Sequence, residues 1–187
     1  MTIAVRMRGI HKRFGAVQAN RAVELTVAAG TVHGIVGENG AGKSTLMSIL
    51  YGFYQADEGS IEVEGRPVRI DGSRQAIALG IGMVHQHFML VEPLSALDNV
   101  MLGAEPHWRL STARDVVRER LQALMRETGL AVRLDVPVED LPVGERQRLE
   151  ILKALYRGAR ILILDEPTAV LTPQETEALF ATLRQLR

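Results

Sequence analysis

The sequence contains no cysteine, few aromatic residues and no long apolar run. Without cysteine the chain has no disulfide framework, no thiolate metal site and no cysteine nucleophile, a composition that fits a reducing compartment. No apolar run approaches the ~18 residues needed to cross a bilayer, and the N-terminus does not resemble a signal peptide. Any role at a membrane is therefore expected to depend on a partner.

An excess of charge of either sign is also missing. The chain has 22 basic and 22 acidic residues, so it lacks the overall field that drives non-specific binding to nucleic acid. Nucleic acid is therefore not an expected partner. With 187 residues, of which 47% are hydrophobic, the chain can bury one substantial core, and we expect one domain with an inserted lobe.

Two kinds of hydrophobic pattern predict strands. Alternating apolar residues indicate antiparallel strands in TIAVRMRG, AVELTV and SIEVEGRPVRI. Continuous apolar runs in TVHGIVG and ARILILDEP are typical of strands buried on both faces of a parallel sheet. Helical spacing replaces these patterns in DNVMLG, RDVVRERLQALMRETG and RQRLEILKALYRG, and a last helix is expected to begin at Thr172 and Pro173.

The segment GENGAGKST meets the phosphate-loop pattern G-x-x-x-x-G-K-[ST] in full, between an expected strand and an expected helix. The glycines let successive backbone N–H groups face a phosphate, and Lys43 supplies a charge for the β- and γ-phosphates. The Ser44 hydroxyl group would bind Mg²⁺. A glycine-rich turn that precedes a helix by chance is the alternative. The predicted nucleotide-binding residues of the loop are Gly37, Glu38, Asn39, Gly40, Ala41, Gly42, Lys43, Ser44 and Thr45.

Two acidic residues follow the apolar run ILIL directly. Asp165 is placed to hold the metal ion, and Glu166 is placed to take a proton from the attacking water. An ordinary solvated strand end is the alternative. Together these patterns predict an α/β fold: a P-loop NTPase core with a parallel sheet, an antiparallel β lobe and an inserted helical lobe.

These motifs resemble the ATP-binding cassette (ABC) ATPases of membrane transporters, over essentially the whole chain. HQHFMLVEPLSALDNVMLG is similar to the glutamine loop of that family, which implies that Gln86 contacts the metal and the attacking water. HKRFGAV places Phe14 where the family stacks an aromatic ring on adenine, although a lone Phe is more often a core residue. His85 and His87 are expected to be strand-end residues rather than metal ligands. The sequences of these segments are most similar to the N-terminal cassettes of simple-sugar and nucleoside importers, whose subunits usually hold two cassettes.

The segment LPVGE stands where the family has Leu-Ser-Gly-Gly-Gln, at a helix start that contacts the γ-phosphate held by the opposite cassette. Leu141 and Gly144 match, whereas Pro142, Val143 and Glu145 replace serine, glycine and glutamine. Proline supplies neither a hydroxyl group nor an N–H donor, and glutamate adds negative charge beside an anion. We therefore expect a weakened anion site, with a plain helix cap as the alternative.

The resemblance also implies a histidine on a later strand, and no residue of this sequence matches it. Thr172 stands where an aspartate is usual. We therefore expect a domain truncated at its C-terminus, with the core and β lobe at about residues 1–91 and 158–187 and the helical lobe at about residues 92–157.

The function implied by the resemblance is that of the ATP-binding and ATP-hydrolysing motor domain of an importer for simple sugars or nucleosides. It would use ATP and Mg²⁺, with Glu166, Gln86 and Lys43 as catalytic residues and Ser44, Gln86 and Asp165 at the metal. A soluble ABC ATPase without a permease, and a regulatory module that binds ATP with little hydrolysis, remain open.

The implied partners are a second cassette, in the same polypeptide or in a homodimer, and transmembrane permease subunits. An extracytoplasmic substrate-binding protein would act indirectly, and the domain would lie at the cytoplasmic face of the membrane as a peripheral subunit. We expect residues 88–103 to contact the permease, because apolar side chains crowd this segment: Phe88, Met89, Leu90, Leu94 and Leu97. Packing in the core is the competing explanation for them.

Overall fold

A computed structural model describes residues 2–86, 88–102, 110–169 and 171–186. The chain divides into two compact units, residues 1–81 and residues 82–186, with the division at the start of strand β5 (Ile81–Val84). His87 and Gly103 lie outside the described residues, so the expectations for these two positions stay predictions.

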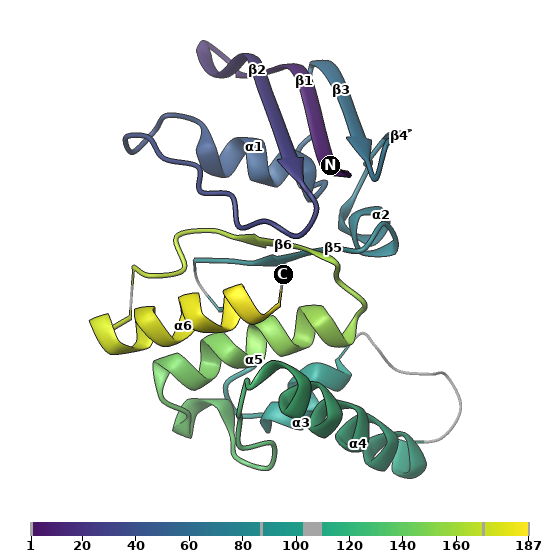
Figure 1. Cartoon of the computed structure of the whole chain (residues 1–187), viewed down its shortest axis with the longest axis vertical. Coiled ribbons are helices and arrows are strands. Elements are labelled where there is room, and N and C mark those ends of the chain that lie inside the picture. Colours follow the sequence, from purple (N-terminus) through teal and green to yellow (C-terminus); the bar gives the residue numbers. More distant parts are fainter. Residues whose placement is uncertain (1, 87, 103–109, 170, 187) are drawn as a thin grey trace. The chain divides into compact units, whose positions relative to one another are not determined.

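The first unit is built on a four-stranded antiparallel sheet in the order β2-β1-β3-β4 (Figure 1). The alternating apolar residues of β1 make the buried face of this sheet, with Val5, Met7 and Ile10 almost fully buried. These strands confirm the three that the alternation predicted. The strands are β1 (Ile3–Phe14), β2 (Val17–Ala28), β3 (Glu58–Val63) and β4 (Arg66–Val68), and the helices of this unit are α1 (Lys43–Leu50) and α2 (Ser73–Ala78).

Residues 31–38 form no strand, and the prediction of a buried strand in front of the glycine-rich loop is wrong. Val36 is 96% exposed, and Val32 and Ile35 are exposed as well. An apolar run becomes a buried strand only where neighbouring strands pair with its backbone. None of the strands in the described part of the chain pairs with this segment.

The second unit holds a two-stranded sheet of β5 and β6 (Ile161–Leu164). The N–H group of Asp165, just after β6, donates to the carbonyl oxygen of Val84 at the end of β5, at 3.0 Å. The two strands therefore end side by side and run parallel, as the continuous apolar pattern of β6 predicted. The helices are α3 (Ala96–Met101), α4 (Leu110–Thr128), the 3₁₀ turn η1 (Val138–Asp140), α5 (Val143–Tyr156) and α6 (Pro173–Gln185).

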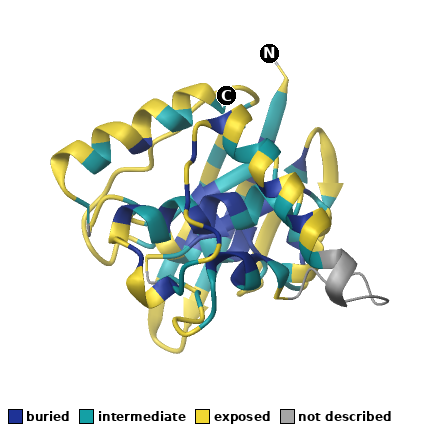
Figure 2. Ribbon diagram, turned by 90° about the horizontal axis from the view of Figure 1, so that it is seen from below, coloured by how far each residue is buried: buried dark blue, intermediate teal, exposed yellow. Residues whose placement is uncertain are grey.

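Helices α3, α4 and α5 surround the core of the second unit. The helical spacing predicted for these segments is confirmed, because Val117 and Leu121 of α4 and Leu149 and Leu152 of α5 are buried and belong to one cluster. The buried residues are drawn in dark blue in Figure 2. No helix formed by the described residues has the length and apolar character that crossing a membrane requires. Together the two units confirm the predicted α/β class, whereas the domain boundaries stay a prediction.

Two helix starts follow from their sequences. Helix α6 begins with a capping box, in which the Thr172 side chain accepts the Glu175 N–H group and the Glu175 carboxylate accepts the Thr172 N–H group. Helix α5 begins at Val143 with Pro142 as its N-cap residue, and no side chain caps it. Its first turn therefore differs from that of α6, and the altered LPVGE segment spans the start of α5.

Candidate active site

The glycine-rich loop is closed by its own lysine. The Nζ atom of Lys43 donates to the carbonyl oxygens of Gly37 and Glu38, at 2.7 and 2.8 Å. No side chain caps α1, and its first turn contains no acidic residue. A loop with an ammonium group, an uncapped helix start and no nearby carboxylate in that turn is suited to an anion such as a nucleotide phosphate.

The junction between the loop and α1 requires glycine at position 42. Gly42 has a φ of 84°, in the left-handed region, and a Cβ atom there would lie 2.1 Å from the carbonyl oxygen of Ala19. Asn20 of β2 is buried and donates its side-chain amide to the Gly42 carbonyl oxygen at 3.1 Å. Strand β2 therefore fixes the backbone at the point where the loop becomes a helix.

Phe14 lies at the end of β1 in the same unit and is exposed, which excludes the core position that was the alternative for it. Its ring packs edge-on against Tyr54, with 5.0 Å between the ring centroids. The Nζ atom of Lys12 lies 5.5 Å from the centroid of the Phe14 ring. The exposure of the ring is compatible with stacking on an adenine base, and this role stays a prediction.

The two predicted carboxylates lie in the second unit, directly after β6. Asp165 is tied to β5 through its N–H group, as described above, and Glu166 is exposed. Glu166 has a φ of 47°, a left-handed conformation that is uncommon for any residue except glycine. The turn after it is closed by the Ala169 N–H group, which donates to the Glu166 carbonyl oxygen at 3.1 Å.

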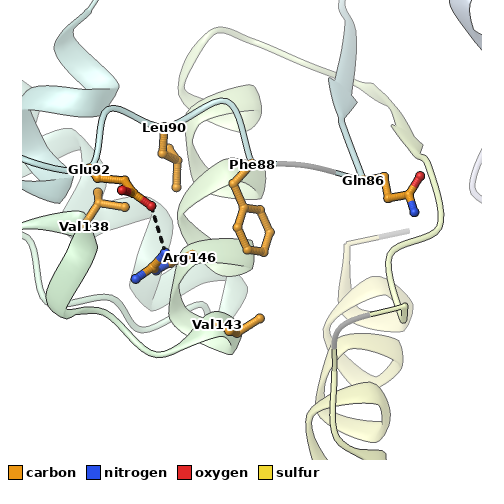
Figure 3. A pocket seen from close by; sticks show the side chains of 7 residues that line it. All are labelled: Gln86, Phe88, Leu90, Glu92, Val138, Val143 and Arg146. Carbon is orange, nitrogen blue, oxygen red and sulfur yellow. Dashed lines mark hydrogen bonds and ion pairs between the residues drawn. The ribbon is translucent and has the colours of Figure 1, made fainter.

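Gln86 follows β5 and lines a pocket of about 250 Å³ in the second unit (Figure 3). In the figure Gln86 lies at one end, apart from an ion pair between Glu92 and Arg146, whose nitrogen and oxygen atoms are 3.5 Å apart. The remaining lining residues are apolar: Phe88, Leu90, Val138 and Val143.

His85 directly follows the same strand, next to the strand end where it was expected. Burial lowers the pKa of His85, and the charges of Glu150 and Asp165 oppose that shift. Burial also lowers the pKa of Lys153, which lies 3.8 Å from Glu150. In the part of the chain that is described, no three His, Asp or Glu side chains form a group that could hold a metal ion by themselves.

The LPVGE segment has a different environment at each position. Leu141 is buried, Pro142 is exposed, and Val143 is exposed at the edge of the pocket. Glu145 is paired with Arg133, whose Nε atom lies 3.2 Å from the carboxylate and whose N–H group also donates to it. This ion pair offsets the negative charge that Glu145 adds at the start of α5.

Gly144 is covered by Glu175, which comes from the first turn of α6. A Cβ atom at Gly144 would lie 2.6 Å from the Oε1 atom of Glu175, so no larger residue fits without a shift. The Gly144 N–H group contributes to lowering the pKa of Glu175, after the N–H and hydroxyl groups of Thr172. In this conformation a carboxylate of the chain itself occupies the start of α5.

We expect the Glu175 carboxyl group to titrate below its ordinary pKa of 4.5. Because its pKa is lower in the folded state, its contacts stabilise the fold above the ordinary pKa, and this contribution is lost as the pH falls through the folded-state pKa. An NMR titration of the side-chain carboxyl carbon would measure it. In Thr172→Val, which keeps the shape and loses the hydroxyl group, the pKa should move part of the way back, and no movement would contradict the role of the hydroxyl group.

Comparison with known proteins identifies the family of the chain. The family model described as "ABC transporter" matches residues 20–169. The chain therefore belongs to the ABC transporter family, as the motifs predicted, and its domain is of the ATPase class.

The curated relatives it matches are import ATP-binding proteins. The chain is 48% identical to ribose import ATP-binding protein RbsA 1 of Burkholderia thailandensis, over 100% of this chain and 37% of that protein. It is 45% identical to guanosine import ATP-binding protein NupO of Bacillus subtilis (100% and 36%). It is 46% identical to glucose import ATP-binding protein TsgD13 of Haloferax volcanii (97% and 38%). The chain thus spans less than two-fifths of the length of each.

Solved structures agree on the fold. MJ1267, an ATP-binding cassette of an ABC transporter, superposes with a TM-score of 0.86 at 27% identity, over 100% of this chain and 77% of that one. A nucleotide-free ATP-binding cassette from an ABC transporter gives a TM-score of 0.85 at 25% identity, over 98% of this chain and 77% of that one.

Sequence reasoning missed three side chains that support these segments: Asn20, Gln147 and Glu175. Gln147 could have been found, because it lies three residues after Gly144 and four before Ile151 and so falls on the buried stripe of α5. A polar residue on such a stripe needs a hydrogen-bond partner. The spacing of Thr172 and Glu175 indicates the capping box, but no local pattern indicates the contact of Glu175 with Gly144 or that of Asn20 with Gly42.

Proposed function

We propose that the chain is the ATP-binding and ATP-hydrolysing motor domain of an ABC importer for sugars or nucleosides. The observation that carries the proposal is the phosphate loop. In it Lys43 donates to two carbonyl oxygens of the loop, and no side chain caps the helix that follows. The importers of ribose, guanosine and glucose among its relatives support the class of cargo.

Each predicted site residue has a task in this proposal. Lys43 and the backbone of residues 37–45 bind the triphosphate, and Phe14 stacks on the adenine. Ser44 of the first unit, and Asp165 and Gln86 of the second, are the proposed metal ligands, and bound Mg²⁺ would neutralise charge on the β- and γ-phosphates. Glu166 accepts the proton of the attacking water.

The direct test is hydrolysis by the full subunit assembled with its permease and binding protein in lipid vesicles. We expect ATP hydrolysis that is stimulated by the cargo, and uptake of labelled ribose, glucose or guanosine by at least one such assembly. An assembly that hydrolyses ATP without transporting any sugar or nucleoside would contradict the importer part of the proposal and favour a non-transport ATPase.

The permease is proposed to dock on the second unit at the pocket beside Gln86. Phe88 and Leu90 line this pocket, and Met89 between them is 63% exposed. Leu97 is 0% exposed and belongs to the core, so the expectation that it contributes to this surface is wrong. The Asn99 side chain fixes the segment, because its amide donates to the Val91 carbonyl oxygen and accepts the Val91 N–H group.

We expect Met89→Asp to abolish capture of the permease while MgATP affinity and thermal stability stay unchanged. The reason is that an exposed apolar residue in a docking surface loses its contact when it becomes charged, whereas an exposed position tolerates the change in the free chain. Capture of the detergent-solubilised permease on the immobilised subunit measures the effect.

Val116→Asp is the matched control, because Val116 is an apolar residue of α4 with an exposed fraction of 62%. It should leave capture intact. Loss of capture in both variants, or in neither, would contradict docking at Met89.

A further inference from the structure

The turn that carries Glu166 is held at several points. Before it, the Asp165 N–H group is bonded to β5, and after it the ring of Pro167 fixes the φ angle of the chain. Glu166 itself lies in the left-handed region at a φ of 47°. A conformation of this kind persists only where the surrounding structure holds it.

A further hydrogen bond to this turn comes from α5. Gln147 is 3% exposed, and its Nε2 atom donates to the carbonyl oxygen of Pro167 at 2.7 Å. Gln147 is the third residue after Gly144, and the carbonyl group that it binds directly follows Glu166 and Pro167 in the chain. The bond therefore links the start of α5 to the turn of the catalytic carboxylate.

We infer that Gln147 is a positioning residue for Glu166. Its amide fixes the Pro167 carbonyl group, which together with the sheet bond at Asp165 holds the backbone on both sides of Glu166. This inference rests on the proposed function, because it assigns Gln147 a part in orienting the general base. Gln147 need not touch the nucleotide.

Two variants separate this role from packing. Gln147→Met has a side chain of the same length without the donor, and Gln147→Glu has the same shape with an acceptor in place of the amide. Both fill the space that Gln147 occupies. Leu149→Ala is the control, because Leu149 lies on the same helix, is 0% exposed, and its truncation lowers stability by leaving a cavity rather than by removing the bond.

The experiment measures three quantities. In the full subunit assembled with its permease, we expect the kcat for ATP to fall about tenfold to a hundredfold in both Gln147 variants, since a small misplacement of a catalytic group has an effect of this order. The Kd of the isolated chain for MgATP should stay within about twofold. Hydrogen exchange at the Ala169 amide, which is bonded to Glu166, should become faster, while exchange in β6 stays unchanged.

Each outcome decides between two statements. If the wild-type assembly hydrolyses ATP and Gln147→Met does so within about threefold of it, the positioning role is overturned and the proposed function stands. A fall in kcat of the same size in Leu149→Ala would also overturn it, because general loss of stability would then explain the effect. If the wild-type assembly does not hydrolyse ATP, the proposed function fails, and the inference about Gln147 fails with it.

Discussion

Lys43→Ala should lower the affinity of the chain for MgATP at least tenfold, which corresponds to about 1.4 kcal/mol. Two effects act in the same direction. The substitution removes the positive charge for the β- and γ-phosphates, and it removes the bonds from Nζ to the carbonyl oxygens of Gly37 and Glu38 that close the loop. Isothermal titration calorimetry of the folded variant measures the change directly.

Arg69→Ala is a suitable control for this result. Arg69 is a cation of the same unit, exposed and paired with Asp71, and it lies outside the glycine-rich loop. Its loss should leave the affinity for MgATP unchanged. Equal affinities of wild type and Lys43→Ala would show that the loop of residues 37–45 is not the triphosphate site, and equal losses in both variants would indicate a non-specific effect of charge.

The sequence predicted those parts of the fold whose signal is local. Alternation in β1 and β2, the apolar stripe of α4 and the Thr172–Pro173 start of α6 each depend on residues close together in the chain, and all are present. The segment from 31 to 38 shows the limit. Its apolar character is real, but a strand also needs a partner for its backbone, and composition does not reveal whether one is available.

The candidate site shows the same division. The glycine pattern, Lys43 and the carboxylate pair could be proposed from the sequence, because their spacing along the chain is fixed by the chemistry of a phosphate loop and a strand end. The charge of Glu145 was predicted to weaken the start of α5, but its pairing with Arg133 was not, and neither was the Glu175 carboxylate over Gly144. These contacts join segments that are distant in the sequence, and only the folded chain brings them together.

Glu166→Gln should lower ATP turnover of the full subunit with its permease by about 10²–10⁴-fold, the usual contribution of a general base. The amide keeps the size of the side chain and cannot take the proton from the attacking water. Because Glu166 acts on water rather than on the phosphates, the Kd for MgATP should stay within about twofold. The exposed position of Glu166 makes the fold indifferent to the change.

In the isolated chain the same substitution should change little, because we expect its turnover to be marginal. A homodimer would offer only LPVGE to the opposite nucleotide, with Pro142 lacking an N–H group and Gly144 covered by Glu175. Losing one preorganised donor costs about 10²–10³ in rate.

Steady-state phosphate release from both preparations is the measurement, with Glu177→Gln on α6 as an exposed control that should retain full activity. Turnover of the isolated chain near 1 s⁻¹, the low end of ordinary enzyme rates, would show that the altered helix start still serves catalysis, and full activity of Glu166→Gln in the assembly would remove Glu166 from the role of general base.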